Sequence, residues 1–210
     1  MQNNLFIIAK SGWKYIGYAL AAFIIFFILD IEFLAFLALV TIAFLLYLFR
    51  NPEREMPFLQ KNALLSPVDG VITAIEEVQN SEYRYKIEIE SSYCNVGVLR
   101  LPMNAKVTSF KMVHGSRMSQ KSKLFSSLNE YAEILFVDSE ENSVKINHRL
   151  KQSFAPIDIY LQMNQELVQG ARYGSMINGV TSLYIESNFR LNVTVGQELS
   201  ASKTLIGYFS

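Results

Sequence analysis

The chain is poor in residues that cross-link proteins or bind structural metals. Its 210 residues include one cysteine, Cys94, and two histidines, His114 and His148. A single cysteine excludes an internal disulfide and suits a reducing compartment, and its commonest role is that of a small buried hydrophobic residue. Three scattered ligands are too few for a structural zinc site. We therefore expect a fold without disulfides and without a bound metal.

An excess of charge and the common catalytic motifs are also lacking. The 19 basic and 19 acidic residues balance to zero net charge at pH 7, which gives no indication of nucleic-acid binding. The sequence contains no glycine-rich phosphate loop and no Gly-x-Ser-x-Gly segment. A P-loop nucleotide-binding protein and an ordinary serine hydrolase therefore have no support.

Two long apolar runs near the N-terminus are the clearest feature that is present. They cover Trp13–Leu29 and Phe33–Phe49, and only Asp30-Ile31-Glu32 separates them. Each run is as long as the ~17–25 residues that a helix needs to cross a bilayer. We predict a transmembrane hairpin over residues 1–50, each run forming one span, and no cleavable signal peptide, because a second span follows the first. The alternative is a re-entrant hairpin, which would place two carboxylates at mid-depth at a high cost.

The charges that flank these runs predict an orientation. Lys10 and Lys14 lie at the start of the first run, Arg50 and Arg54 follow the second, and the connection between them carries only acidic residues. Basic flanks stay on the cytoplasmic side of a membrane. We therefore expect both termini and the remaining domain to be cytoplasmic, at the inner membrane if the source is a bacterium.

Residues 51–210 have the pattern of a soluble all-β domain. Tyr83–Glu90 alternates apolar and polar residues, as a half-buried strand does, and Asp-Gly and Asn-Gly turn signals separate it from similar short segments. We predict a sandwich or barrel of eight or more strands. The predicted strands are Val71–Ile75, Tyr83–Glu90, Val96–Leu101, Ala132–Val137, Ser143–Asn147, Ile157–Leu161, Ser182–Glu186 and Asn192–Val195.

One loop of this domain is polar and basic. Gly115–Asn129 contains Arg117, Lys121 and Lys123. Two interpretations stay open: a loop that lies on anionic lipid headgroups, or an ordinary solvated loop.

Several segments, taken in order, resemble the short membrane-anchored form of phosphatidylserine decarboxylase. Each segment alone is weak, but their order and spacing are specific, and the resemblance covers about residues 45–208. The segments that carry it are Leu48–Arg54, Ser66-Pro67-Val68-Asp69-Gly70, Val98–Ala105, Val113-His114-Gly115, Asn129-Glu130, Gly170–Ile177 and Val195–Thr204.

The resemblance implies a self-processing enzyme with a pyruvoyl cofactor. In that family the chain cuts itself between a glycine and a serine, and the serine becomes an N-terminal pyruvoyl group. This ketone forms a Schiff base with the amine of the lipid headgroup and accepts electrons as carbon dioxide leaves. An aspartate and a histidine form the base system that activates the serine.

Carried over residue by residue, the motifs keep the aspartate and lose its partners. Asp69 stands at the catalytic aspartate, although a turn residue before Gly70 is an equal alternative. The motif histidine falls at Gly97, and the second histidine of the longer relatives falls at Arg100. The processing pair reads Gly179-Val180, and valine has no hydroxyl from which a pyruvoyl group could form.

Two other serine or threonine positions keep the cleavage question open. A shift of the alignment by one residue places Thr181 or Ser182 near the cut, but neither follows a glycine. Gly174-Ser175 is a true Gly-Ser pair that lies five residues early, so Ser175 is either a processing site or a turn hydroxyl bonded to backbone.

These substitutions indicate a membrane-anchored, decarboxylase-like protein of phospholipid metabolism that has lost the reaction. No cofactor is then expected, whereas self-cleavage at Ser175 would give a pyruvoyl group and an active decarboxylase. Two further alternatives are a non-catalytic module that binds phospholipid or a partner enzyme, and a structural membrane protein that docks other proteins. The expected partners are membrane phospholipid and either a second copy or a partner enzyme, with no nucleic acid.

Overall fold

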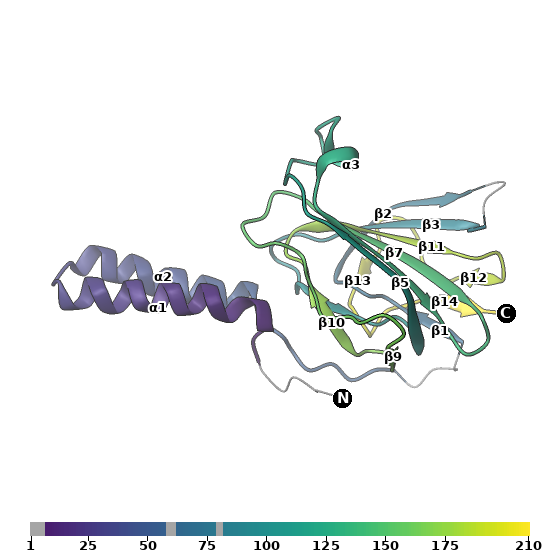
Figure 1. Cartoon of the computed structure of the whole chain (residues 1–210), viewed down its shortest axis with the longest axis horizontal. Coiled ribbons are helices and arrows are strands. Elements are labelled where there is room, and N and C mark those ends of the chain that lie inside the picture. Colours follow the sequence, from purple (N-terminus) through teal and green to yellow (C-terminus); the bar gives the residue numbers. More distant parts are fainter. Residues whose placement is uncertain (1–6, 58–61, 79–81) are drawn as a thin grey trace. The chain divides into compact units, whose positions relative to one another are not determined.

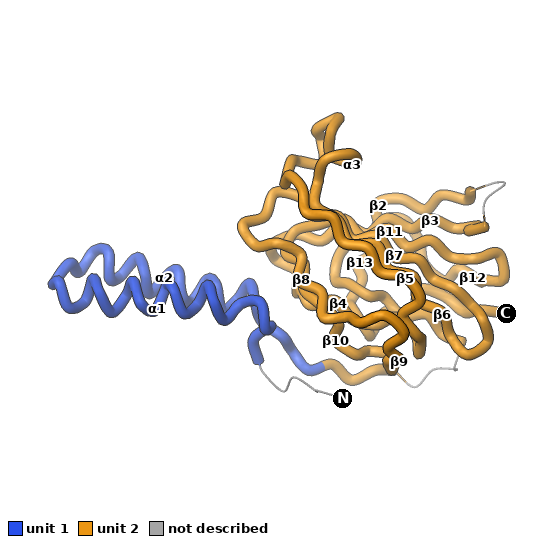
Figure 2. The backbone as a smooth tube through the Cα atoms, in the orientation of Figure 1, with its two compact units in different colours: residues 1–53 blue, residues 54–210 orange. Residues whose placement is uncertain are grey.

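The computed structural model describes residues 7–57, 62–78 and 82–210. The chain divides into two compact units, residues 1–53 and residues 54–210 (Figure 2). The first unit is helical and the second is built from strands.

The first unit is an antiparallel pair of apolar helices (Figure 1). A 3-10 turn, η1 (Lys10–Gly12), leads into α1 (Trp13–Ile28), and α2 (Glu32–Leu48) returns after a turn at Asp30, whose φ is 57°. The two predicted helices are therefore confirmed as helices. By length and composition Lys10–Ile28 is the one helix among the described residues that is able to cross a membrane, whereas α2, with 17 residues, is a shorter apolar helix, so the second predicted span stays a prediction.

Backbone hydrogen bonds join the residues that precede α1 to the residues that follow α2. The Ala9 amide donates to the Phe49 carbonyl at 2.7 Å, and the Asn51 amide donates to the Ile7 carbonyl at 2.6 Å. Gly12 is needed here, because a Cβ at this position would lie 2.5 Å from atoms of the Phe49 side chain. Many large apolar side chains of the pair face outward, including Phe27 at 70% exposure, as expected of a surface made for lipid rather than water.

The second unit contains one large antiparallel sheet and two small ones. The large sheet has the order β13-β2-β3-β11-β7-β6-β5-β9, and the small sheets have the orders β4-β10-β8 and β1-β14-β12. The bounds are β1 Ala63–Leu65, β2 Gly70–Glu77, β3 Tyr85–Glu90, β4 Val98–Arg100, β5 Ala105–Val113, β6 Tyr131–Val137, β7 Ser143–Leu150, β8 Asp158–Ile159, β9 Glu166–Leu167, β10 Arg172–Ser175, β11 Gly179–Ile185, β12 Phe189–Leu191, β13 Glu198–Leu199 and β14 Leu205–Phe209. The only helix among the described residues of this unit is α3 (Phe125–Leu128).

All three sheets share one hydrophobic core. Alternate residues of the central strands β6, β7 and β11 are almost fully buried, as the period of two requires. Phe136 of the large sheet packs against Tyr173 of a small sheet, with ring centroids 5.6 Å apart. Leu64, Ile206 and other residues of the third sheet belong to the same cluster. The prediction of an all-β domain is confirmed.

Some of the predicted strands and the predicted environment of Cys94 differ from the structure. The predicted strand at Asn192–Val195 is wrong, because residues 192–194 form an irregular segment after β12 and Val195 begins a turn. A further strand, β5, is absent from the predictions; its nine residues contain a bulge between Val107 and Ser109. The bulge moves later side chains to the other face, so the strand never shows a simple alternation. The expected burial of Cys94 is wrong as well, since this residue is exposed in the turn after β3.

Candidate functional site

Asp69 is held by an arginine that comes from the start of the same unit. Its carboxylate accepts two hydrogen bonds from the Arg54 guanidinium, at 2.5 and 2.6 Å, and a third from the Ala201 amide at 2.8 Å. The Val96 amide approaches at 3.4 Å. The side chains of Arg54 and Asp69 are only 9% and 12% exposed. Because a carboxylate has about four acceptor positions, Asp69 has little capacity left to orient a histidine.

Ser91 connects Asp69 to the position where the sequence analysis places the cut. The Ser91 hydroxyl donates to the backbone carbonyl of Asp69 at 2.5 Å, and the Ser91 amide donates to the carbonyl of Gly179 at 2.9 Å. The structure therefore brings Asp69 and Gly179 to the same site from opposite ends of the domain sequence. Ser91 belongs to no motif, so this link could not be predicted from the sequence.

Gly97 lies at the same site, in surroundings that would be tight for a side chain. A Cβ there would lie 3.0 Å from the Met176 carbonyl oxygen and 3.1 Å from an Ile177 side-chain atom. A Cβ at Gly179 would lie 2.4 Å from the Met176 sulfur. Met176 thus lies next to both glycines, its backbone beside Gly97 and its side chain beside Gly179.

Val180 is enclosed in the large sheet. It lies in β11, opposite Glu90 of β3 on one side and Arg149 of β7 on the other, and it is 5% exposed. Its side chain offers neither a nucleophile nor a proton donor. The next residue, Thr181, faces the opposite side of the sheet, as neighbours in a strand do.

On that opposite face lies a buried polar network that the sequence did not reveal. His148 has no exposed surface, and its two ring nitrogens lie 2.8 Å from the Thr181 hydroxyl and 2.6 Å from the Tyr173 hydroxyl. Burial lowers the pKa of His148 to about 3 and raises the pKa of Tyr173, so both groups are neutral near pH 7. With both nitrogens engaged, this histidine joins two sheets and does not face Val180.

The other candidate residues lie in the small sheet formed by β4, β10 and β8. Arg100 is 4% exposed and lies opposite Arg172. Ser175 is also 4% exposed, and it lies in the middle strand, opposite Val98 on one side and Asp158 on the other. The peptide between Gly174 and Ser175 is therefore packed between two strands, and the next residue, Met176, donates its amide to the Gly97 carbonyl at 2.7 Å.

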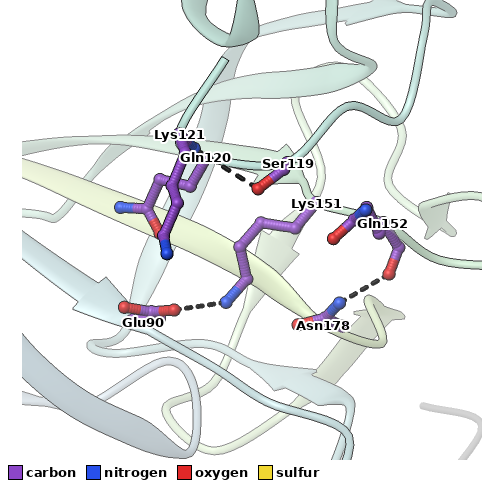
Figure 3. Close-up of a pocket in the computed structure, with 7 residues that line it drawn as sticks. All are labelled: Glu90, Ser119, Gln120, Lys121, Lys151, Gln152 and Asn178. Atoms are coloured by element: carbon purple, nitrogen blue, oxygen red, sulfur yellow. Dashed lines mark hydrogen bonds and ion pairs between the residues drawn. The ribbon is translucent and has the colours of Figure 1, made fainter.

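A polar pocket of about 490 Å³ opens beside Gly179 (Figure 3). Lys151, which follows β7, reaches across β11 and places its ammonium 2.5 Å from the carboxylate of Glu90 at the end of β3. The Asn178 amide donates to the Gln152 carbonyl at 2.5 Å. The lining residues are Glu90, Ser119, Gln120, Lys121, Lys151, Gln152 and Asn178.

The sequence of this chain is similar to a known protein family and to individual members of it. The family described as phosphatidylserine decarboxylase matches residues 41–207. A phosphatidylserine decarboxylase proenzyme from Desulfotalea psychrophila is 29% identical over 205 residues, which cover 95% of each chain. A proenzyme of the same name from Geobacter metallireducens is 27% identical, over 99% of each chain. The matched region covers most of the sequence, and the chain belongs to the phosphatidylserine decarboxylase family.

Proposed function

We propose that this protein is a membrane-anchored member of the family, acting in phospholipid metabolism, that stays uncut and no longer decarboxylates. Val180 is the observation that carries the proposal. The family reaction needs a hydroxyl after the scissile glycine, and the residue that follows Gly179 supplies none. Gly97 stands where the base is expected and supplies no imidazole. The ion pair with Arg54 gives Asp69 a structural role that does not depend on catalysis.

The residues at the aligned position do not fit a pyruvoyl group. That group would supply an electron sink when formed from serine, but valine cannot yield it. The surrounding frame remains: the Gly179 carbonyl still accepts the Ser91 amide, and Met176 fills the space next to both glycines. This arrangement supports a binding function at the former reaction site rather than chemistry on a lipid.

We further propose that α1 and α2 both cross the membrane and that the β domain lies on the cytoplasmic face. In support, Lys10 lies in η1, Lys14 lies in the first turn of α1 and Arg50 follows α2. Asp30 and Glu32 lie at the opposite end of the pair. Basic residues mark the cytoplasmic end of a span. In a bacterium this membrane is the inner one.

The intact mass of the purified full-length protein tests the loss of processing. We expect a single chain of 24.0 kDa, as the sequence encodes, with no new N-terminus. Two fragments that separate after Gly179 would contradict the proposal. Two fragments that separate after Gly174, with a pyruvoyl group in place of Ser175, would instead establish the active alternative.

Restoring the hydroxyl alone should not restore cleavage. Val180→Ser recreates a Gly-Ser pair, but no imidazole contacts this position, because residue 97 is glycine and His148 lies on the other face of the sheet. We expect the variant to keep its full mass after prolonged incubation. Cleavage of this single variant would show that the loss rests on residue 180 alone and that another group still serves as the base.

A further inference from the structure

The loop between β5 and β6, Gly115–Asn129, presents apolar and basic side chains together. Leu124 and Leu128 are 49% and 46% exposed, and Lys121 and Lys123 are exposed as well. Leu124 immediately precedes the short helix α3 and Leu128 is its last residue. This helix stands away from the sheets in Figure 1. The loop contains no acidic residue, so the lysines give it a net positive charge.

Hydrogen bonds hold the two ends of this loop together. The amide of Ser116 donates to the carbonyl of Leu128 at 2.8 Å, which brings the two ends together as in an Ω-loop. Asn129 is 1% exposed, and its side-chain amide donates to the carbonyls of Met118 and Leu150, both at 2.8 Å. The exposed leucines are therefore held in place by a defined frame.

The third basic residue of the loop, Arg117, points into the domain. Arg117 lies 3.4 Å from Glu130, which is almost fully buried, and it donates to the carbonyls of Ser153 and Phe154 at 3.1 and 2.9 Å. Arg117 thus fixes the loop base. The outward charge comes from Lys121 and Lys123, on the same short stretch as the leucines.

We propose that this loop is a membrane-docking surface, with Leu124 and Leu128 entering the interface of an anionic bilayer and Lys121 and Lys123 contacting its headgroups. Each lysine near an anionic surface contributes about 1 kcal/mol, or about fivefold in partitioning. The occupant is lipid rather than protein because the charge is uniformly basic and because, on the proposed function, the helix pair anchors the domain within reach of a bilayer. Lys121 also lines the pocket that holds Glu90 and Lys151 (Figure 3), so docking would turn that pocket toward the headgroup layer.

A fluorescent probe in the loop of the full-length protein tests this docking. Cys94→Ser removes the native thiol, and Ser126→Cys places an environment-sensitive dye on α3. The protein is reconstituted into vesicles of phosphatidylcholine, either alone or with about 30% phosphatidylglycerol. In the anionic vesicles we expect the emission of the dye to shift to the blue and lipid-borne quenchers to reach it. In Lys121→Ser/Lys123→Ser we expect docking to be about 25-fold weaker, as the product of two fivefold effects. Leu124→Ser/Leu128→Ser should abolish the blue shift.

Matched variants separate docking from general effects. Lys106→Ser/Lys111→Ser removes two exposed lysines of β5, and Met163→Ser/Val168→Ser removes two exposed apolar side chains near β9; both should leave the dye response unchanged. A dye that stays in water while the protein floats with the vesicles overturns the docking proposal and leaves the anchor intact. Protein that does not float with vesicles at all contradicts the anchor itself. A blue shift in detergent that grows with protein concentration would overturn lipid docking in favour of a second copy.

Discussion

Replacing Arg54 with methionine is expected to lower the free energy of unfolding of the β domain by about 3–5 kcal/mol. The change leaves the carboxylate of Asp69, 12% exposed, without its positive partner, while the Ala201 amide remains as a donor. Removing one member of a buried ion pair costs this much because a desolvated charge is left uncompensated. A typical domain is stable by only about 5–15 kcal/mol, so the loss would be large. Urea denaturation of the full-length protein in mild detergent, followed by near-ultraviolet circular dichroism, measures it.

Two comparisons make this expectation specific. Arg54→Met/Asp69→Asn removes both charges and should be more stable than Arg54→Met alone, since no unpaired carboxylate remains. Lys145→Met breaks the pair that Lys145 forms with Glu133 at 3.2 Å, where both side chains are about one-third exposed. This control should lose less than about 1 kcal/mol. Equal losses for Arg54→Met and Lys145→Met would contradict a structural role for the Asp69 pair.

On the proposed function, the Arg54 pair also accounts for a site that keeps the aspartate without the other family residues. A histidine at position 97 would then serve chemistry only, and the glycine there allows the Met176 backbone to approach closely. Asp69, in contrast, receives Arg54 and the Ala201 amide, so its loss would harm the fold itself. An aspartate in such a position is expected to be kept whether or not the protein catalyses the family reaction. Its presence alone is therefore poor evidence for catalysis in this chain.

Run length and alternation made much of the fold predictable. The helices at the N-terminus follow from two apolar runs and the acidic turn at Asp30, because these are local properties of the sequence. Strands such as β6 and β7 follow from strict alternation. The strand β5 was not predicted because its bulge at Val107–Ser109 breaks the alternation of apolar and polar residues. The strand β1, with three buried residues, is too short to show a period.

The site was less predictable because long-range contacts create it. The proposed departures from the family motif at Gly97 and Val180 are predictions that can be made from the sequence. The roles of Arg54 and Ser91 are not, since each depends on a contact with Asp69 that only the folded sheet arrangement makes. The network around His148 joins β7, β10 and β11, and it requires the register that places this histidine opposite Thr181.

The buried histidine is expected to make the stability of the domain strongly pH-dependent below pH 6.5. Its pKa is about 3 in the folded protein, because burial disfavours the charged ring, and about 6.5 in the unfolded chain. Between these values the unfolded chain binds a proton that the folded protein does not, so the free energy of unfolding falls as the pH falls. The slope from this one residue is about 1.4 kcal/mol per pH unit, and above pH 6.5 its contribution is complete.

His148→Gln tests this dependence, because an amide can still bond to Thr181 and Tyr173 but cannot be protonated in this range. Urea midpoints of the full-length protein from about pH 4.5 to 7.5 should fall less steeply in the variant, with a difference of about 3 kcal/mol accumulated by pH 4.5. Carboxylates contribute equally to both proteins, so the difference between the two slopes isolates His148. His114→Gln, whose ring is 79% exposed, is the matched control for the removal of a histidine, and the slope of each variant is compared with that of the unmodified protein. If His148→Gln also keeps that slope, then the imidazole is reached by protons in the folded state and the closed network between the two sheets does not hold.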